Sequence, residues 1–359
     1  MTLLITGATG FIGRHVCAQL SRDNQTLHAV LRQPHAQLPA LREQVDALGG
    51  HGDRIHAVKG DLDLPGLGLP DDLAAPDAII HLGARFAWQL DRDVAHRTNV
   101  AGSLAVAELA RRHGSRLVFV SGFMLENHEH LQRLGISRED PERVDWQQVY
   151  RRAGGYEASK LEAAIRVRAL ATEHHLDMIE VQPATVAGHS HTGALDTAQP
   201  LFALLDNLAR GRMTMVPGTA AHWLPLVAVD HLATLIALAA TTDNVPKRLL
   251  ALDPATPNLK GLLAIAAEAL GRRAPQRHLP IPVLAALLRI PGMPRLMNSW
   301  PEALHFIQPT RFDTSVTDEF LRLRELERPA SEEVIAASAR WYRQHRNGEP
   351  KPALRLTAL

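Results

Sequence analysis

The amino-acid sequence predicts an α/β protein, with a doubly wound parallel sheet followed by a smaller, mostly helical C-terminal portion. Within residues 1–120, five predicted strands alternate with stretches of helical spacing, and the first of them, at residues 3–5, is an apolar run typical of a fully buried strand. That alternation is the pattern of a parallel sheet covered by helices. Glycines, an arginine, an acid and a serine follow the ends of these strands, where ligands bind in such sheets. They are Gly7, Arg32, Asp61, Gly83 and Ser121.

The first strand is predicted at residues 3–5 and is followed by glycines at positions 7, 10 and 13. Helical spacing begins after Gly13. Gly7 permits a tight turn, Gly10 lets backbone N–H groups approach a pyrophosphate, and Gly13 lets the helix pack closely. The helix N-terminus adds partial positive charge. A flexible turn is the alternative, but a strand, a glycine turn and a helix in succession favour the dinucleotide-binding fingerprint of a Rossmann fold.

Further strands are predicted at residues 26–31, 55–58, 77–82 and 117–120, and helices at 94–112, 151–173 and 331–345. Arg32 ends the second strand, where an acid would hold the ribose hydroxyls of NAD and an arginine accommodates the phosphate of NADP. Arg14 could supply a second cation. We therefore predict NADP(H) rather than two incidental surface arginines. Asp61 could bond the adenine amino group or cap a turn.

Tyr156 and Lys160 are predicted to lie on one helix, after a charged, irregular insertion at residues 126–149. A spacing of four residues places them about 40° apart around the axis and roughly 6 Å along it. An ammonium near a phenol lowers the phenol pKa, so Tyr156 is expected to exchange a proton near neutral pH. An incidental pair is the alternative.

Six motifs carry a family resemblance. They are Thr6-Gly7-Ala8-Thr9-Gly10-Phe11-Ile12-Gly13, Asp61-Leu62, His81-Leu82-Gly83-Ala84, Asn99-Val100-Ala101-Gly102, Tyr156-Glu157-Ala158-Ser159-Lys160 and Gln182-Pro183-Ala184-Thr185-Val186-Ala187-Gly188. With them the chain resembles an extended short-chain dehydrogenase/reductase, nearest the acyl and thioester reductase branch. The resemblance implies that Tyr156 is the general acid/base, that Lys160 holds the nicotinamide ribose, and that the stretch after Pro183 lines the nicotinamide. The cofactor-binding candidates are Gly7, Thr9, Gly10, Phe11, Ile12, Arg32, Asp61, Leu62, Leu82, Gly83, Ala84, Asn99, Lys160, Pro183, Thr185 and Val186.

One position departs from the family pattern, which places a catalytic serine or threonine just beyond the fifth strand. Here Gly122 aligns with that position and Ser121 precedes it. Consecutive strand residues point to opposite faces, so Ser121 becomes catalytic only if the strand end bends at Gly122. Otherwise a residue such as Asn127, or a water, takes the role.

Residues 1–188, with 223–254 returning to them, are predicted to form the NADP-binding domain. Residues 189–222 and 255–345 would form the substrate-binding portion, and 346–359 a flexible tail. The stretch 280–297 mixes prolines with apolar residues. It is expected to form an apolar wall over the site, or else core packing and an oligomer contact.

Composition narrows the class of protein. A net charge of +1 without a basic run argues against nucleic acid as a partner. Cys17 is expected to be a buried small hydrophobe. His128-Glu129-His130 lacks metal-ligand spacing, so no metal is predicted and these histidines are interpreted as solvated or capping. The apolar run 232–240 is too short to span a bilayer, and a strand starting at residue 2 leaves no room for a signal peptide. A soluble cytoplasmic protein is expected.

These observations predict an NADP(H)-dependent oxidoreductase that transfers hydride to or from a carbonyl, an alcohol or an acyl thioester with a lipophilic body. A small-molecule substrate is implied, and a homodimer is allowed. The first rival is a nucleotide-sugar epimerase or dehydratase with bound NAD, which would favour an acid in place of Arg32. The second, suggested by Gly122, is a non-catalytic NADP-binding sensor.

Overall fold

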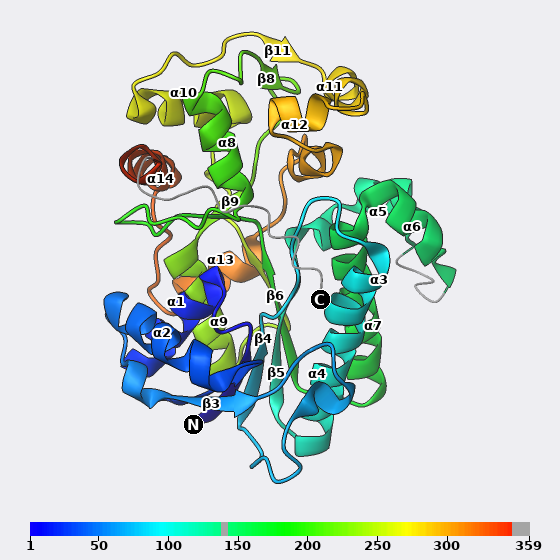
Figure 1. The fold of residues 1–359 in the computed structure, drawn as a ribbon, viewed down its shortest axis with the longest axis vertical. Helices are drawn as coiled ribbons and strands as arrows, with labels where there is room; N and C mark the ends of the chain where they lie inside the picture. The colour runs from blue at the N-terminus through cyan, green and yellow to red at the C-terminus, as the bar shows by residue number, and fades with distance from the viewer. Residues whose placement is uncertain (138–142, 347–359) are drawn as a thin grey trace. The chain divides into compact units, whose positions relative to one another are not determined.

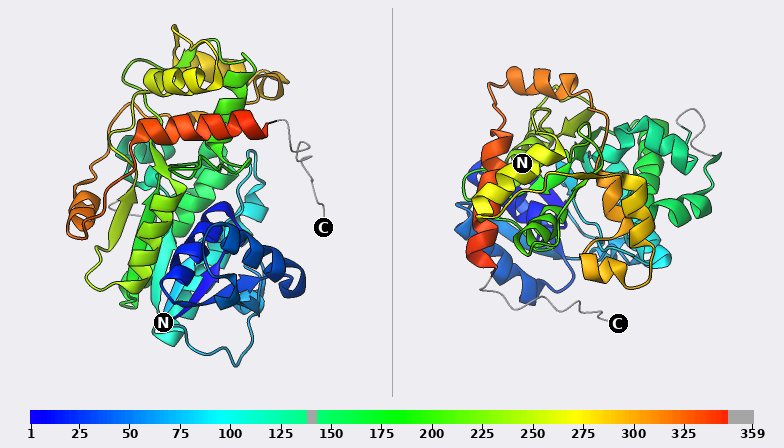
Figure 2. Two further views of the ribbon diagram at one scale, coloured as in Figure 1. Left: turned by 90° about the vertical axis from the view of Figure 1, so that its left-hand side faces the viewer. Right: turned by 90° about the horizontal axis from the view of Figure 1, so that it is seen from above.

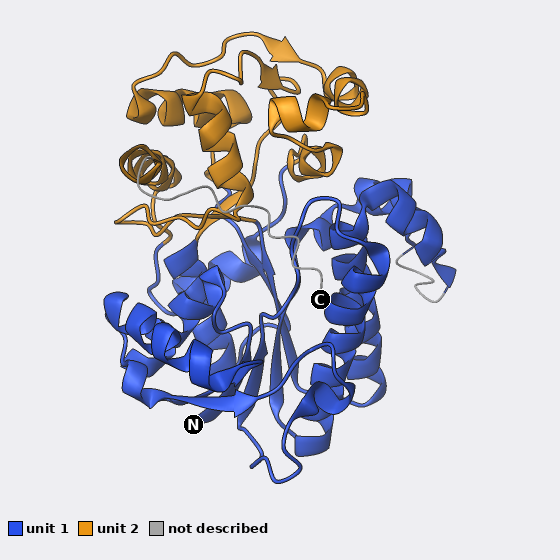
Figure 3. Ribbon diagram, in the orientation of Figure 1, with its two compact units in different colours: residues 1–184, 229–254, 311–327 blue, residues 185–228, 255–310, 328–359 orange. Residues whose placement is uncertain are grey.

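The computed structural model describes residues 1–137 and 143–346. The chain divides into two compact units, coloured separately in Figure 3. The first comprises residues 1–184, 229–254 and 311–327, and the second comprises 185–228, 255–310 and 328–359. The tail expected beyond residue 346 lies outside the described residues.

The first unit contains, among its described residues, a parallel sheet of seven strands in the order β10-β6-β5-β4-β1-β2-β3. The strands are β1 (Thr2–Thr6), β2 (Thr26–Leu31), β3 (Ile55–Lys59), β4 (Ala78–His81), β5 (Arg116–Val120), β6 (Met178–Pro183) and β10 (Arg248–Ala251). The central strands are buried on both faces, as in β1, where residues 3–5 are at most 1% exposed, while the edge strand β3 is partly exposed. The predicted doubly wound sheet is confirmed. The strand order reverses between β1 and β4, and ligands of such sheets bind at that reversal.

Helices cover both faces of this sheet (Figure 1). Helices α1 and α9 pack together on one face, while α4 and α7 pack together on the other. The helices of the first unit are α1 (Phe11–Arg22), α2 (Pro34–Ala47), α3 (Arg92–Ala95), α4 (Gly102–His113), α5 (His128–Leu134), α6 (Trp146–Ala153), α7 (Gly155–Glu173), α9 (Val229–Thr241) and α13 (Ser315–Arg322). Cys17 is fully buried on α1, as predicted, and burial raises its thiol pKa to about 12.

Three sequence-based assignments need correction. The helix predicted at 94–112 is interrupted by a π-helical turn at His96–Ala101, between α3 and α4. The helix predicted at 151–173 is broken at Gly154, whose φ of 82° and ψ of 167° separate α6 from α7. The insertion at 126–149 is also less irregular than predicted, because α5 and the first turn of α6 lie within it.

The second unit is mostly helical in its described part. Its elements are β7 (Thr185–Ala187), β8 (Val216–Pro217), β9 (Leu226–Ala228), β11 (His278–Leu279), α8 (Pro200–Ala209), α10 (Leu259–Leu270), α11 (Ile281–Leu288), α12 (Met293–Met297) and α14 (Ser331–His345). Helix α14 has the predicted bounds and packs against α10, as the left view of Figure 2 shows. Trp223, fully buried, donates its indole N–H to the Thr310 carbonyl over 3.0 Å.

The stretch 280–297 forms α11 and α12 and has a mixed character. Leu284 and Leu288 are buried in a cluster with Leu304, while Ile290 and Leu296 are 50% and 70% exposed. Core packing therefore accounts for only part of this apolar stretch.

Residues 311–327, predicted to belong to the substrate-binding portion, lie instead in the first unit. Helix α13 packs on β10, and the Thr317 hydroxyl accepts a 2.9 Å hydrogen bond from the Leu250 N–H. Within residues 1–137 and 143–346, no helix is both long and apolar enough to cross a membrane.

Candidate active site

The glycine loop after β1 is built by close backbone contacts. Gly7 has a φ of 74°, and a Cβ there would lie 2.7 Å from the Gly83 nitrogen at the end of β4. A Cβ on Gly13 would lie 2.1 Å from the Gly7 carbonyl oxygen, so only glycine lets α1 start this close to the loop. Gly10 caps α1 without a side-chain hydrogen bond, which leaves the first N–H groups of the helix directed at the loop. These features suit the pyrophosphate of a dinucleotide.

The residues predicted to contact the adenosine end lie at the ends of β2 and β3. Arg32 follows β2 and is exposed. One carboxylate oxygen of Asp61 accepts a 3.0 Å hydrogen bond from the Asp63 N–H, so Asp61 caps a turn, which was the alternative reading of this residue.

Asn99 lies on the π-helical turn and is buried at 1% exposure. Its amide oxygen accepts from the Arg85 N–H over 2.7 Å, and its amide nitrogen donates to the Arg85 carbonyl and to the Ser159 hydroxyl. Since both amide donors are used within the protein, Asn99 ties the loop after β4 to α7. Its predicted role in contacting the cofactor stays a prediction.

Tyr156 lies in the first turn of α7 and is half-buried. Its ring packs edge-on against Phe86, with the ring centroids 4.6 Å apart. Burial, with a further contribution from the Glu157 charge, raises the Tyr156 pKa to about 12. The predicted lowering of this pKa by Lys160 is therefore wrong for this arrangement. A phenol with a raised pKa holds its proton at neutral pH.

Lys160 lies one helical turn after Tyr156 and points to the carboxyl end of β5. Its ammonium nitrogen donates to the Val120 carbonyl over 2.8 Å and lies 5.8 Å from the Phe119 ring centroid. Burial lowers the Lys160 pKa to about 8, against a rise caused by Glu180. The bond to Val120 also explains the Tyr156 result, because the ammonium is directed at the strand end.

Ser121 is buried, and its hydroxyl donates to Glu180 over 2.5 Å. That bond directs the Ser121 proton to a group inside the sheet, and whether Ser121 is catalytic stays a prediction. At Gly122 the backbone is extended, with φ −179°, and a Cβ would meet nothing within 4 Å. The alternative residue Asn127 caps α5, where its side-chain oxygen accepts from the His130 N–H over 3.0 Å.

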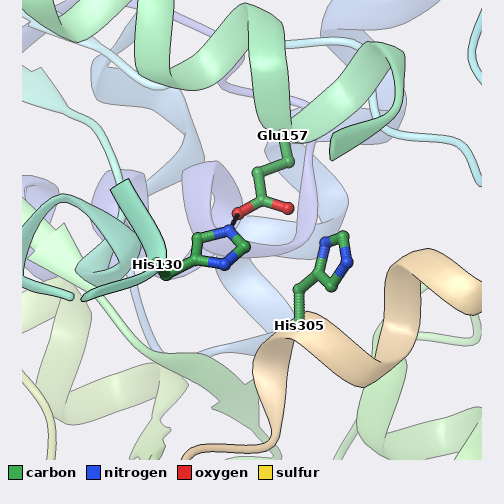
Figure 4. A group of neighbouring side chains, drawn as sticks. All are labelled: His130, Glu157 and His305. Carbon is green, nitrogen blue, oxygen red and sulfur yellow. Dashed lines mark hydrogen bonds and ion pairs between the residues drawn. The ribbon is translucent and has the colours of Figure 1, made fainter. Parts of the chain in front are cut away.

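His130 and Glu157 form a buried pair beside Tyr156. The His130 ring nitrogen Nε2 and a Glu157 carboxylate oxygen are 2.6 Å apart, and the two side chains are 8% and 7% exposed (Figure 4). The interpretation of His130 as solvated or capping is therefore wrong. Position 130 could not be distinguished from the exposed neighbours His128 and Glu129, because α5 was not predicted.

The remaining predicted cofactor residues fall in three places. Thr9, Phe11 and Ile12 lie at the start of α1, and Leu62 follows Asp61. Leu82 and Ala84 follow β4. Pro183 ends β6, while Thr185 and Val186 form β7 in the second unit. The Thr185 hydroxyl is buried and has no hydrogen-bond partner among the described residues, as a ligand-binding hydroxyl would.

Sequence reasoning missed Phe86 and Glu180. Nothing in the sequence marks Phe86, because the loop after β4 has no periodicity. Glu180 could have been noticed in the sequence, because it is the one acidic residue in the segment that forms β6. An acid inside a fully buried strand needs partners and could have been singled out.

Comparison with known proteins gives one family. Residues 5–236 match the sequence profile of the NAD_binding_4 family, described as Male sterility protein. A PKS-NRPS hybrid synthetase from Chaetomium globosum is 30% identical over 219 residues, which cover 57% of this chain and 4% of that protein. Dihydroflavonol 4-reductase from Zea mays is 28% identical over 242 residues, which cover 65% of this chain and 64% of that protein. The chain thus spans less than two thirds of either relative.

A solved structure, the terminal R domain from the myxalamid PKS-NRPS biosynthetic pathway, has a TM-score of 0.72 with 23% identity, covering 97% of this chain and 91% of that chain. At this identity the likeness shows the fold alone. The sequence profile extends from β1 into α9 and so includes the glycine loop, Tyr156 and Lys160. The chain belongs to the Male sterility protein family of NAD(P)-dependent extended short-chain dehydrogenases/reductases.

Proposed function

We propose that this protein is an NADP(H)-dependent reductase of carbonyl or acyl thioester substrates with a lipophilic body. The observation that carries the proposal is the pair of Tyr156 and Lys160 on α7. Lys160 is hydrogen-bonded to the carboxyl end of β5, on the same sheet edge as the glycine loop. When bound, the dinucleotide supplies the hydride. The protein supplies position, charge and a proton.

Tyr156 supplies the proton. Its raised pKa keeps the hydroxyl protonated at neutral pH, so it can donate to the oxygen that gains negative charge as the carbonyl carbon is reduced. Lys160 places a positive charge one turn away and would fix the nicotinamide ribose. This protonation state favours the direction of reduction.

Three features support the finer assignments. Arg32 is exposed at the end of β2, where a cation suits the additional phosphate of NADP. The name of the Chaetomium globosum relative includes a polyketide synthase and peptide synthetase, and the myxalamid R domain comes from such a pathway. The family resemblance to acyl and thioester reductases is why acyl thioesters come first in the substrate panel.

The test is to follow the absorbance of NADPH and of NADH in the presence of acyl thioesters, aldehydes and ketones. The expected result is faster oxidation of NADPH, lost in Tyr156→Phe. Arg32→Ala should weaken NADPH binding while leaving NADH binding unchanged. Preference for NADH in the wild type would contradict the role of Arg32 and favour a nucleotide-sugar epimerase or dehydratase. Cofactor binding without turnover of any substrate would favour the non-catalytic sensor.

A further inference from the structure

Glu180 is a carboxylate inside the sheet that the proposed chemistry does not use. It lies in the middle of β6 and is 0% exposed. In the sheet register it pairs with Phe119 of β5, so the two side chains lie on the same face. A buried charge persists only when it is paired and hydrogen-bonded, so the partners of Glu180 define what it does.

Both carboxylate oxygens of Glu180 are occupied. The Ser121 hydroxyl donates to Oε1 over 2.5 Å, and the Arg168 guanidinium donates to Oε2 over 2.7 Å. Arg168 lies on α7, eight residues and thus about two turns after Lys160, so both cations project from one side of that helix. The carboxylate is fixed between the end of β5 and the helix that carries Lys160.

Two titratable groups on neighbouring strands interact electrostatically with the Lys160 ammonium, His81 from β4 and Glu180 from β6. Burial, and the charge of Lys160 itself, lower the His81 pKa to about 3, so His81 is neutral. The Lys160 ammonium lies over the Phe119 ring. Glu180 is paired with Phe119 across the sheet, and the two adjacent strands lie about 5 Å apart. Glu180 therefore supplies a negative charge that opposes the effect of burial on Lys160.

We propose that Glu180 is a positioning residue that acts through Lys160: its carboxylate, fixed by Ser121 and Arg168, keeps the ammonium that bonds the Val120 carbonyl charged. The part that Lys160 plays in the reaction rests on the proposed function. In the same arrangement the Ser121 hydroxyl donates its proton to Glu180.

The test is a pH titration of the full chain labelled with ¹³C at the lysine ε-carbons, followed by NMR. The chain has five lysines, and the Lys160 signal is identified by its loss in Lys160→Arg. In Glu180→Gln the proton affinity of Lys160 should fall roughly tenfold, a shift of about one pKa unit of the kind caused by losing one nearby opposite charge. In Arg168→Gln the proton affinity of Lys160 should rise, because the negative charge of Glu180 is then no longer compensated by the Arg168 guanidinium.

Glu162→Gln is the matched control, since Glu162 is also a buried carboxylate on an arginine, with a 2.6 Å contact to Arg166 on the same helix. It should leave the Lys160 midpoint unchanged. An unchanged midpoint in Glu180→Gln, or an equal fall in Glu162→Gln, would overturn the inference. If circular dichroism shows that Glu180→Gln does not fold, the titration of Arg168→Gln becomes the test. A Lys160 midpoint that does not rise in Arg168→Gln then overturns the inference. The titration needs neither cofactor nor turnover, so its failure is distinct from failure of the proposed function.

Discussion

Raising the pH above about 8 should lower the rate of reduction, because Lys160 loses its charge at a lower pH than the one at which Tyr156 loses its proton. The Lys160 pKa is about 8 and the Tyr156 pKa is about 12. Reduction requires both groups protonated, since Tyr156 donates its proton and Lys160 contributes positive charge. The protonated fraction of Lys160 is about 90% at pH 7 and about 9% at pH 9, so kcat/KM should fall roughly tenfold between these values.

The assay measures initial rates of NADPH oxidation from pH 6 to pH 10 with a fixed substrate. The ratio kcat/KM is the informative parameter because it reports groups of the free protein. Lys160→Arg is the diagnostic variant, since a guanidinium stays charged over this whole range. Its profile should lose the fall near pH 8, whatever its absolute rate. The reasoning is refuted if Lys160→Arg shows the same fall, or if the wild-type rate is constant up to pH 9.5.

Three further predictions concern single positions. Gly13→Ala places a methyl group 2.1 Å from the Gly7 carbonyl oxygen and should lower the free energy of unfolding by about 1–3 kcal/mol in urea denaturation. Gly122→Ala is the control, because its methyl group would meet nothing within 4 Å and should not lower the free energy of unfolding. Gly122→Ser restores a hydroxyl where the family places one and should raise kcat roughly 2- to 10-fold, the effect of one hydrogen bond; an unchanged kcat argues against this alignment. Asn99→Leu removes three hydrogen bonds, one buried and two partly buried, and should lower the free energy of unfolding by about 2–4 kcal/mol. A change below about 0.5 kcal/mol in urea would show that these bonds do not hold the loop.

The sheet could be predicted from the sequence because its determinants are local. Each strand of β1 to β5 is a short apolar run, and each run is followed by a residue that stops it. The helix boundaries were less predictable. Gly154 breaks the predicted helix at 151–173 through a positive φ, and the Gly154-Gly155 pair is a turn signal that could have marked this break.

The chemistry of the site was only partly predictable, because hydrogen-bond partners are set by tertiary contacts. Spacing placed Tyr156 and Lys160 on one helix, and that much needs only the helical repeat. Their pKa values depend on Val120, Glu157 and Glu180, and which of these groups surround the pair follows from packing rather than from spacing. Burial then outweighs the expected interaction between the phenol and the ammonium.

A chain of neutral hydrogen bonds connects the glycine loop to the helix of Tyr156. The Gly83 N–H donates to the Thr6 hydroxyl, which is 2.7 Å from Nδ1 of His81, and Nε2 of His81 is 2.8 Å from the Ser103 hydroxyl. Ser103 in turn donates to the Asn99 carbonyl over 2.6 Å. Because the Ser103 hydroxyl donates its proton to the Asn99 carbonyl, its oxygen must accept the hydrogen bond from Nε2–H of His81.

The direction of the bond between His81 and Ser103 determines the direction of the remaining hydrogen bonds in the series. Nδ1 of His81 is then left to accept the Thr6 proton, and His81 is neutral, in agreement with its pKa of about 3. From Asn99 the bonds continue through its side chain to Ser159, whose hydroxyl donates to the Tyr156 carbonyl over 2.8 Å. A second proton on His81 would leave the Thr6 proton without an acceptor and would add a positive charge facing Lys160. The loop predicted to bind phosphate and the helix of the predicted proton donor are therefore connected by hydrogen bonds between groups that stay uncharged while His81 is neutral.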